Sequence, residues 1–308
     1  MEPNKKILIT GISGFIGKNL SVYLKSKGYE IIGIDVTRGG EQHCDTFYLG
    51  SFSDENINKI ALKGIETVFH LGAIVGVDRC QNNPVLVRQV NFSETVSFFD
   101  MCVEVGVKKI IFSSSSEIYG NSKNLPYCED MEVAPFSLYG QCKKDVEIYL
   151  KTLSEKTNVQ VCIPRFFNVY GNGQRSDFVV TKFINLIKEN KNIEIYGTGF
   201  QTRSHTYIDD VVSALEKMIT YNKNSYEIIN IGSTFEYSMN DVAKIILELF
   251  PNSKSKIVHV NYGSNGIRNV FLEIDRRIPS IKKAEEKLSF RAKTDLPEGI
   301  QKIIETIK

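Results

Sequence analysis

The sequence predicts an α/β fold in which a doubly wound parallel sheet is accompanied by a smaller, interleaved mixed α/β domain. Two observations predict it. Strand-like and helix-like segments alternate through the first half of the 308 residues, which is the order of a parallel sheet covered by helices on both faces. A glycine-rich turn, residues 11–17, follows the first apolar strand and opens the first helix.

The elements of the first domain follow from their apolar patterns. Short apolar runs bounded by turn residues predict strands near 6–10, 29–34, 67–71, 108–113 and 160–164. Longer amphipathic stretches predict helices near 15–27, 84–105 and 138–156. Pro84 suits the first turn of the second helix, and Gly106 suits its C-cap.

The order of elements changes after residue 164. The pattern predicts a helix near 178–189, a strand near 193–196, a helix near 209–219, a strand near 226–231 and a helix near 239–249. We expect the strand near 226–231 to return to the first sheet. We therefore assign residues 1–168 to the first domain, with 201–235 returning to it, and residues 169–200 and 236–308 to the second.

Composition excludes several classes of protein. The formal charge of +2 indicates neither a nucleic-acid-binding surface nor an acidic tail, so we expect no nucleic-acid partner. Neither a signal peptide nor an apolar run of membrane-spanning length is visible, so we expect a cytoplasmic protein without a membrane partner. The six cysteines and four histidines are dispersed, which indicates reduced thiols and no metal site.

The glycine-rich turn has the spacing of a dinucleotide-binding motif. Gly11 permits a tight turn, Gly14 lets the backbone approach a pyrophosphate, and Gly17 lets the helix pack closely on the sheet. The phosphates then meet free N–H groups at the positive end of the helix dipole. Asp35 ends the second strand, where a carboxylate accepts hydrogen bonds from an adenosine ribose. A glycine-rich turn without a ligand is the alternative.

Candidate catalytic residues follow the strand near 108–113. Serines occupy positions 113–116, where this strand reaches the carboxyl edge of the sheet, and ligands bind at that edge in open α/β folds. Tyr139 and Lys143 are four residues apart, so they share one face of the helix that follows. We expect the ammonium group to lower the pKa of the phenol and to fit it for proton transfer near neutral pH.

The same Tyr-x-x-x-Lys spacing occurs at two other places. Tyr23 and Lys27 lie on the first helix, where we expect a solvated face. Tyr119 and Lys123 span a loop, so their side chains need not face each other. We therefore predict that the pair at 139 and 143 is the functional one.

Together these motifs resemble the extended short-chain dehydrogenases/reductases of the nucleotide-sugar epimerase/dehydratase/reductase family, which are NAD-dependent. The resemblance covers nearly the whole chain and implies a Rossmann-type first domain that binds NAD and a second domain that binds the nucleotide sugar. The segments that carry it are the turn at 10–17, His70-Leu71-Gly72-Ala73, Asn91, the serines, Tyr139 and Lys143, Arg165-Phe166-Phe167-Asn168-Val169-Tyr170-Gly171, and Arg203 with Tyr207-Ile208-Asp209-Asp210.

The resemblance implies how this chain binds its cofactor. Asp35 is implied to bind the adenosine ribose, which favours NAD(H) over NADP(H) because a 2′-phosphate would face a carboxylate. The family's usual adenine-contacting aspartate is missing from Gly50-Ser51-Phe52, which leaves Ser51 or Asp54 for that contact. The residues implied to contact NAD are Gly11, Gly14, Phe15, Ile16, Gly17, Asp35, Leu71, Ala73, Asn91, Tyr139 and Lys143.

The resemblance also implies the reacting and substrate-binding groups. Tyr139 is implied to be the acid/base and Lys143 its electrostatic partner, while Ser115 hydrogen-bonds the reacting sugar oxygen, with Ser116 beside it. The implied nucleotide-sugar contacts are Asn168, Arg203 and Arg268 at the diphosphate and Tyr196 at the nucleobase. A turn-capping Asn168, a surface Arg268 and a core Tyr196 are the alternatives, and Gly266-Ile267-Arg268-Asn269 departs from the family's Arg-Pro-Gly-Asp pattern.

The neighbours of Ser115 bear on the reaction. The 4,6-dehydratases often carry Asp-Glu where this chain has Ser116-Glu117, the 4-epimerases usually have a neutral residue at the second position, and 4-keto-6-deoxyhexose reductases resemble this chain in Ser-Ser-Glu. We expect oxidoreduction at the sugar C4 of an NDP-sugar. Reduction of an NDP-4-keto-6-deoxyhexose for surface-polysaccharide sugars is favoured, with 4-epimerisation and 4,6-dehydration as alternatives that recycle NAD.

Two further expectations complete the sequence analysis. Glu117 is a catalytic candidate, and a structural carboxylate that caps a loop is its alternative. A non-catalytic NAD-binding scaffold is the alternative from another class, and the intact Ser115, Tyr139 and Lys143 argue against it. The resemblance implies a homodimer through the helices near 84–105 and 138–156, which carry apolar residues on more than one face.

Overall fold

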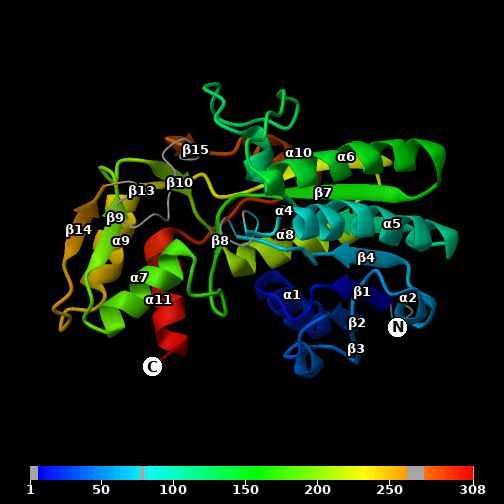
Figure 1. The fold of residues 1–308 in the computed structure, drawn as a ribbon, viewed down its shortest axis with the longest axis horizontal. Helices are drawn as coiled ribbons and strands as arrows, with labels where there is room; N and C mark the ends of the chain where they lie inside the picture. Colours follow the sequence, from blue (N-terminus) through cyan, green and yellow to red (C-terminus); the bar gives the residue numbers. More distant parts are fainter. Residues whose placement is uncertain (1–5, 77–79, 81, 262–273, 308) are drawn as a thin grey trace.

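A parallel sheet forms the centre of the fold (Figure 1). The structure, a computed structural model, describes residues 6–76, 80, 82–261 and 274–307. The strands lie in the order β3-β2-β1-β4-β5-β7-β12, with the short β6 beside β7, and every pairing is parallel. Their bounds are β1 Lys6–Thr10, β2 Glu30–Asp35, β3 Thr46–Leu49, β4 Thr67–His70, β5 Lys109–Phe112, β6 Ser114–Ser115, β7 Gln160–Phe166 and β12 Tyr226–Ile231.

Both faces of this sheet are buried. In β1, Ile7 and Ile9 join one apolar cluster, with α1 and α8, while Leu8 joins another, with α5 and α6. Helices α5 and α6 therefore cover one face of the sheet and α1 and α8 the other, as a doubly wound fold requires. The predicted fold class is confirmed. The covering helices are α1 Phe15–Ser26, α2 Glu55–Ala61, α4 Pro84–Arg88, α5 Thr95–Glu104, α6 Leu138–Lys156 and α8 Ile208–Thr220.

Smaller sheets and four helices complete the fold. The sheets and three of these helices lie beyond one end of the large sheet, at the left of Figure 1, whereas α10 packs against β12. The smaller sheets are β8 Val169–Tyr170 with β11 Thr206–Tyr207, β9 Ile193–Tyr196 with β14 Ile257–Val260, and β10 Thr202–Ser204 between β13 Glu236–Ser238 and β15 Arg276–Arg277. The helices are α7 Val179–Lys188, α9 Met239–Glu248, α10 Lys282–Leu288 and α11 Leu296–Thr306. Strand β12 lies at the edge of the large sheet beside β7, whereas β10, also within 201–235, pairs in a small sheet.

Two features differ from the elements expected from the sequence. Strand β3 and helix α2 lie in a stretch for which no element was predicted. The helix expected at 84–105 is interrupted by the π-helical turn Gln89–Glu94 between α4 and α5. Such turns insert a residue into a helix and are frequent at functional sites.

Lys109 joins the large sheet to the chain that returns to it. This lysine lies on β5 and is buried, and its Nζ donates to the carbonyl oxygens of Met218 (3.1 Å) and Ile219 (2.6 Å) and to that of Tyr221. These carbonyls end α8, where the helix dipole favours a cation. The ammonium therefore ties β5 to a helix a hundred residues later in the chain.

Three further observations concern chemistry. All six cysteines are free thiols, five of them buried. The described residues contain no group of three or more His, Cys, Asp or Glu side chains arranged to hold a metal ion. Across the described ranges, no helix combines the length and apolar character that a bilayer crossing requires.

Candidate active site

The glycine-rich turn has a geometry that only glycine permits. Gly11 has φ +72°, and a Cβ there would lie 2.6 Å from the backbone nitrogen of Gly72. A Cβ on Gly17 would overlap the carbonyl oxygen of Gly11, and one on Gly14 would lie 3.0 Å from the same oxygen. The three glycines thus bring β1, the start of α1 and the chain after β4 into direct backbone contact.

The N-terminus of α1 has the features of a phosphate-binding site. Gly14 is its N-cap in an extended conformation, and no side chain caps the first turn. Phe15 and Ile16 are the first two helical residues, so their N–H groups have no partner within the helix. A helix N-terminus of this kind binds phosphate through its N–H groups and its dipole.

Asp35 lies directly beside this turn. Its carboxylate accepts hydrogen bonds from the backbone N–H of Ser13 (2.9 Å) and from the N–H and hydroxyl of Thr37 (2.9 Å each). These donors fix the carboxylate at the end of β2. Oδ1 accepts two hydrogen bonds and can accept little more, whereas Oδ2 accepts only from Ser13 and has a free lone pair. That oxygen fits a ribose hydroxyl.

The two residues expected at the adenine lie in one turn, where the N–H of Asp54 donates to the carbonyl of Ser51 (3.1 Å). Asp54 is the N-cap of α2 and accepts from the N–H groups of Asn56 and Ile57. Ser51 instead follows Gly50, whose N–H donates to the carbonyl of Asp35 (2.8 Å). The Asp54 carboxylate is thus occupied as a helix cap, whereas Ser51 directly follows the residue that bonds the backbone of Asp35.

The chain after β4 forms the opposite wall. The N–H of Leu71 donates to the carbonyl of Thr10 (3.1 Å), which places the 71–73 segment against the glycine-rich turn. Asn91, in the π-helical turn, binds both backbone groups of Ile74 at 2.8 Å, accepting from its N–H and donating to its carbonyl. Leu71, Ala73 and Asn91 therefore belong to one local structure. The side-chain amide of Asn91 is used in the two hydrogen bonds that position this segment.

The serine segment and the start of α6 meet at the same edge of the sheet. Ser115 is half-buried and caps the turn η3 (Ser116–Tyr119) by accepting from the N–H of Glu117 (3.2 Å). Ser137 caps α6 by accepting from the N–H of Gly140 (3.0 Å), and it donates to the Glu117 carboxylate (2.7 Å). Glu117 thus bridges the turn that carries Ser115 and the helix that carries Tyr139.

Lys143 lies under Tyr139, as the helical spacing predicted. Its Nζ is 5.6 Å from the centroid of the Tyr139 ring and 4.4 Å from that of Phe112, and the lysine is 2% exposed. The other two pairs differ: Lys27 is exposed, while Tyr119 hydrogen-bonds Asn230 (2.7 Å) and Lys123 bonds Asp275. Of the three pairs, the one at 139 and 143 is the one whose lysine is buried with its ammonium group near the tyrosine ring.

Burial governs the protonation of this pair. It lowers the pKa of Lys143 to about 7, because the ammonium is removed from water. Burial also raises the pKa of Tyr139, and the negative charge of the Glu117 carboxylate acts in the same direction. The prediction that Lys143 lowers the pKa of Tyr139 is wrong without cofactor. Burial opposes both the tyrosinate and the ammonium form, so the pKa of Tyr139 is raised.

The predicted substrate-binding residues come from two parts of the smaller domain. Asn168 has φ 32°, and its amide donates to the carbonyl of Ser204 (3.0 Å). It therefore lies against β10, the strand that carries Arg203. Tyr196 is half-buried at the end of β9, and Arg268 lies outside the described residues.

A buried polar network behind the serines was not predicted. Arg165 on β7 forms two hydrogen bonds with Glu147 on α6, at 3.1 and 2.6 Å, and donates to the hydroxyl of Tyr119 (2.9 Å). Ser114 also donates to Glu147 (2.5 Å). The network holds Ser114 and Tyr119, which flank the segment of Ser115 to Glu117. The pattern that hinted at it was Glu147 four residues after Lys143, on the same helix face.

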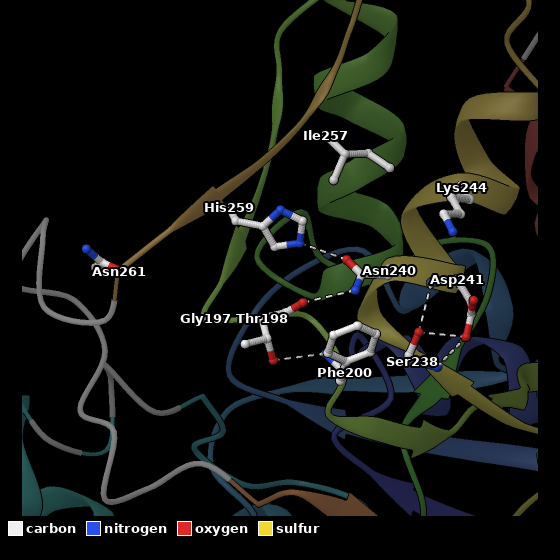
Figure 2. Close-up of a pocket in the computed structure, with 10 residues that line it drawn as sticks. All are labelled: Gly197, Thr198, Phe200, Ser238, Asn240, Asp241, Lys244, Ile257, His259 and Asn261. Carbon is white, nitrogen blue, oxygen red and sulfur yellow. Dashed lines mark hydrogen bonds between the residues drawn. The ribbon is translucent and has the colours of Figure 1, made fainter.

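A surface hollow of about 740 Å³ lies in the smaller domain (Figure 2). Nε2 of His259 on β14 donates to the amide oxygen of Asn240 (2.9 Å), and the amide nitrogen of Asn240 donates to the carbonyl of Thr198 (3.0 Å). His259 pairs in register with Ile195, so it lies on the opposite face of this two-stranded sheet from Tyr196. The hollow is therefore separate from the predicted nucleobase contact.

Comparisons with known proteins agree on one family. Residues 7–232 match the model of the NAD dependent epimerase/dehydratase family. The chain is 32% identical to the UDP-N-acetyl-alpha-D-glucosaminuronate decarboxylase of Bacillus cytotoxicus, covering 98% of this chain and 97% of that one. It is 31% identical to human dTDP-D-glucose 4,6-dehydratase, covering 98% and 89%. The structure of Bacillus cereus UDP-glucuronic acid 4-epimerase with UDP-glucuronic acid and NAD superposes with a TM-score of 0.87, at 27% identity over 98% and 99% of the two chains.

Proposed function

The chain belongs to the NAD-dependent epimerase/dehydratase family, and we propose that it oxidises the C4 hydroxyl of a nucleotide-linked hexose and returns the hydride within the same catalytic cycle. The chain is an NAD-dependent enzyme of nucleotide sugars. What supports the specific step is that the turn capped by Ser115 meets the start of the helix that carries Tyr139 and Lys143, and that the same sheet carries the glycine-rich turn after β1. A hydroxyl, a phenol and an ammonium group are the protein groups that proton transfer at the sugar oxygen requires while a cofactor takes the hydride.

The described residues fit NAD. The backbone cradle of Gly11, Gly14 and Gly17 and the uncapped start of α1 suit a pyrophosphate, and Asp35 suits an unphosphorylated ribose. Ser51 is our proposal for the adenine contact. NAD⁺ held by these residues would supply the hydride acceptor for C4, and its positive charge would favour the tyrosinate form of Tyr139.

The protein groups supply the proton transfer. We assign Tyr139 as the base that removes the proton from the sugar O4 while the hydride leaves C4, and as the acid when the hydride returns. Ser115 would hydrogen-bond the same oxygen. Lys143 has a pKa of about 7, so a modest gain of negative charge at Tyr139 suffices to keep it protonated.

The surroundings of Glu117 favour 4-epimerisation over dehydration. Dehydration needs one group to protonate the departing C6 hydroxyl and another to remove the C5 proton, but Ser116 is a buried hydroxyl and Glu117 accepts a hydrogen bond from Ser137. Epimerisation needs no further acid or base. Decarboxylation likewise needs no further acid or base. When C6 is a carboxylate, the 4-keto intermediate is a β-keto acid, which loses carbon dioxide readily.

The sequence placed reduction of a 4-keto-6-deoxyhexose first, and the comparisons give it no specific support. The relatives reported above are named as an epimerase, a dehydratase and a decarboxylase. Dehydration is the second candidate, because the negative charge of Glu117 acts on Tyr139 and the carboxylate therefore lies near the reacting group.

Product mass decides among these reactions. The purified enzyme is incubated with UDP-glucose, UDP-glucuronate, dTDP-glucose and a 4-keto-6-deoxyhexose nucleotide, each with and without added NADH. An unchanged mass with altered C4 stereochemistry supports the proposal. Loss of water establishes dehydration, loss of carbon dioxide establishes decarboxylation, and stoichiometric consumption of NADH with a gain of two hydrogens establishes reduction. Absence of any product would favour the non-catalytic scaffold.

We propose a homodimer through α4 and α6. Phe98, Phe99, Val146 and Leu150 are buried against the sheet, whereas Val85 is 80% exposed, Leu86 44% and Ile148 58%. An apolar surface of this kind on adjacent helices is typical of a protein interface. Sedimentation equilibrium should give twice the chain mass, and changing Val85 and Leu86 together to lysine should give the monomer.

A further inference from the structure

Two buried polar atoms near Arg203 have no hydrogen-bond partner. They are Nε of Arg277 on β15 and Nε2 of His205, which directly follows β10. Only one other buried side-chain nitrogen or oxygen in the described part of the chain is in this state. Buried donors without partners are rare in folded proteins, since each loses its hydrogen bond to water.

The register of the small sheet brings two positive charges together. Arg203 and Arg277 are directly paired residues on the parallel strands β10 and β15, so their side chains leave the same face of the sheet. Like charges at such positions repel each other. The neighbouring Arg276 belongs to the opposite face, where it pairs with Glu236 at 2.7 Å.

The surroundings place these groups at one locus. Burial raises the pKa of the Tyr127 hydroxyl, and the charges of Arg277 and Arg203 oppose that shift, so both guanidinium groups lie near this hydroxyl. Burial lowers the pKa of His205 to about 4, and Arg203 contributes. His205 is therefore neutral at pH 7 and can donate one hydrogen bond from Nε2.

We propose that Arg277, together with Arg203 and His205, binds the diphosphate of the nucleotide sugar. An anion here would separate the two guanidinium charges and would accept from Nε of Arg277 and, in the tautomer with its proton on Nε2, from His205. Asn168 lies against the same strand, which places this locus beside the other predicted diphosphate contact. The proposal rests on the proposed function, because it names residues that hold that function's substrate.

The test is the affinity of the NAD-loaded full chain for UDP, measured by calorimetry. We expect Arg277→Gln to weaken UDP binding about 10- to 100-fold, the loss of a charge-assisted hydrogen bond, and Arg277→Lys to weaken it less. Arg276→Gln is the matched control and should change the affinity less than about 2-fold, because this arginine faces away. The affinity for NAD should be the same in all four proteins.

Other outcomes overturn the proposal in distinguishable ways. If Arg277→Gln binds UDP like the wild type, or if Arg276→Gln is equally impaired, Arg277 does not hold the diphosphate. If Arg277→Gln impairs UDP-glucuronate but not UDP, the guanidinium binds the sugar carboxylate instead. If the wild type binds none of UDP, dTDP, GDP and CDP, the proposed function fails as well.

Discussion

Replacing Glu147 by glutamine tests the buried network that holds the serine segment. The substitution keeps the size of the side chain but removes its charge, so Arg165, 3% exposed, is left without a counterion. One of the two hydrogen bonds between these residues, at 3.1 and 2.6 Å, is replaced by a contact between two donors. Burial alone would lower the pKa of Arg165, but the bonds to Glu147 raise it, so the arginine stays charged.

The expected loss of unfolding free energy is about 3–5 kcal/mol, the cost of leaving one member of a buried ion pair uncompensated. The pair is nearly fully buried, at 3% and 5% side-chain exposure, so solvent screening does not reduce this figure. Changing Glu147 to leucine and Arg165 to methionine together should cost less than Glu147→Gln, because no charge remains buried.

Urea unfolding followed by circular dichroism measures both effects. Glu155→Gln is the matched control: it removes an exposed carboxylate from the same helix and should change stability by less than about 0.5 kcal/mol. A loss below about 1 kcal/mol for Glu147→Gln, or a double variant less stable than the single one, would refute the argument from burial.

Four further predictions concern the site. Tyr139→Phe should lower turnover at least 100-fold, the usual contribution of a general acid/base, while the NAD affinity measured by fluorescence changes little. Asp35→Ala should shift the ratio of NAD to NADP affinity toward NADP by about 10-fold, since the carboxylate no longer opposes a 2′-phosphate. Gly11→Ala should weaken NAD binding and lower the melting temperature, because its Cβ would overlap Gly72. Lys143→Met should be more stable than the wild type at pH 7, and this difference should shrink toward pH 10. In the folded wild type the pKa of Lys143 is lowered to about 7. Between pH 7 and its ordinary value of 10.5 the unfolded chain therefore binds one proton more than the folded chain, so wild-type stability rises with pH there. Urea unfolding of both proteins at several pH values measures it, and a constant difference would contradict the burial of Lys143.

The sequence predicted best where the local pattern was strong. Strand β1, the glycine-rich turn and helix α1 are adjacent in the chain, so their apolar and glycine positions determined the local structure. Tyr139 and Lys143 share one helix, and their spacing alone placed them on one face. Strand β3 was missed because it is a four-residue edge strand, and its sequence Thr-Phe-Tyr-Leu is too short to give a clear strand pattern.

Contacts between distant residues could not be predicted in this way. Arg165 and Glu147 lie on different elements, and nothing in the local sequence around either residue indicates that the other is its partner. The unpartnered donors of Arg277 and His205 became apparent only from the pairing of β10 with β15. The π-helical turn likewise follows from the bonds of Asn91 with Ile74, because a continuous helix would rotate this amide away.

Lys109 has a consequence for synthesis of the chain on the ribosome. Its ammonium group is buried beneath carbonyls of residues 218, 219 and 221, and β12 completes the sheet only at residue 231. A nascent chain that has reached residue 168 therefore lacks the carbonyls that accept from this ammonium group, and the edge of the sheet at β7 is open. We expect the cofactor-binding unit to fold only after residue 231 has left the exit tunnel, and a recombinant fragment of residues 1–168 to be rescued by adding the remainder as a separate polypeptide.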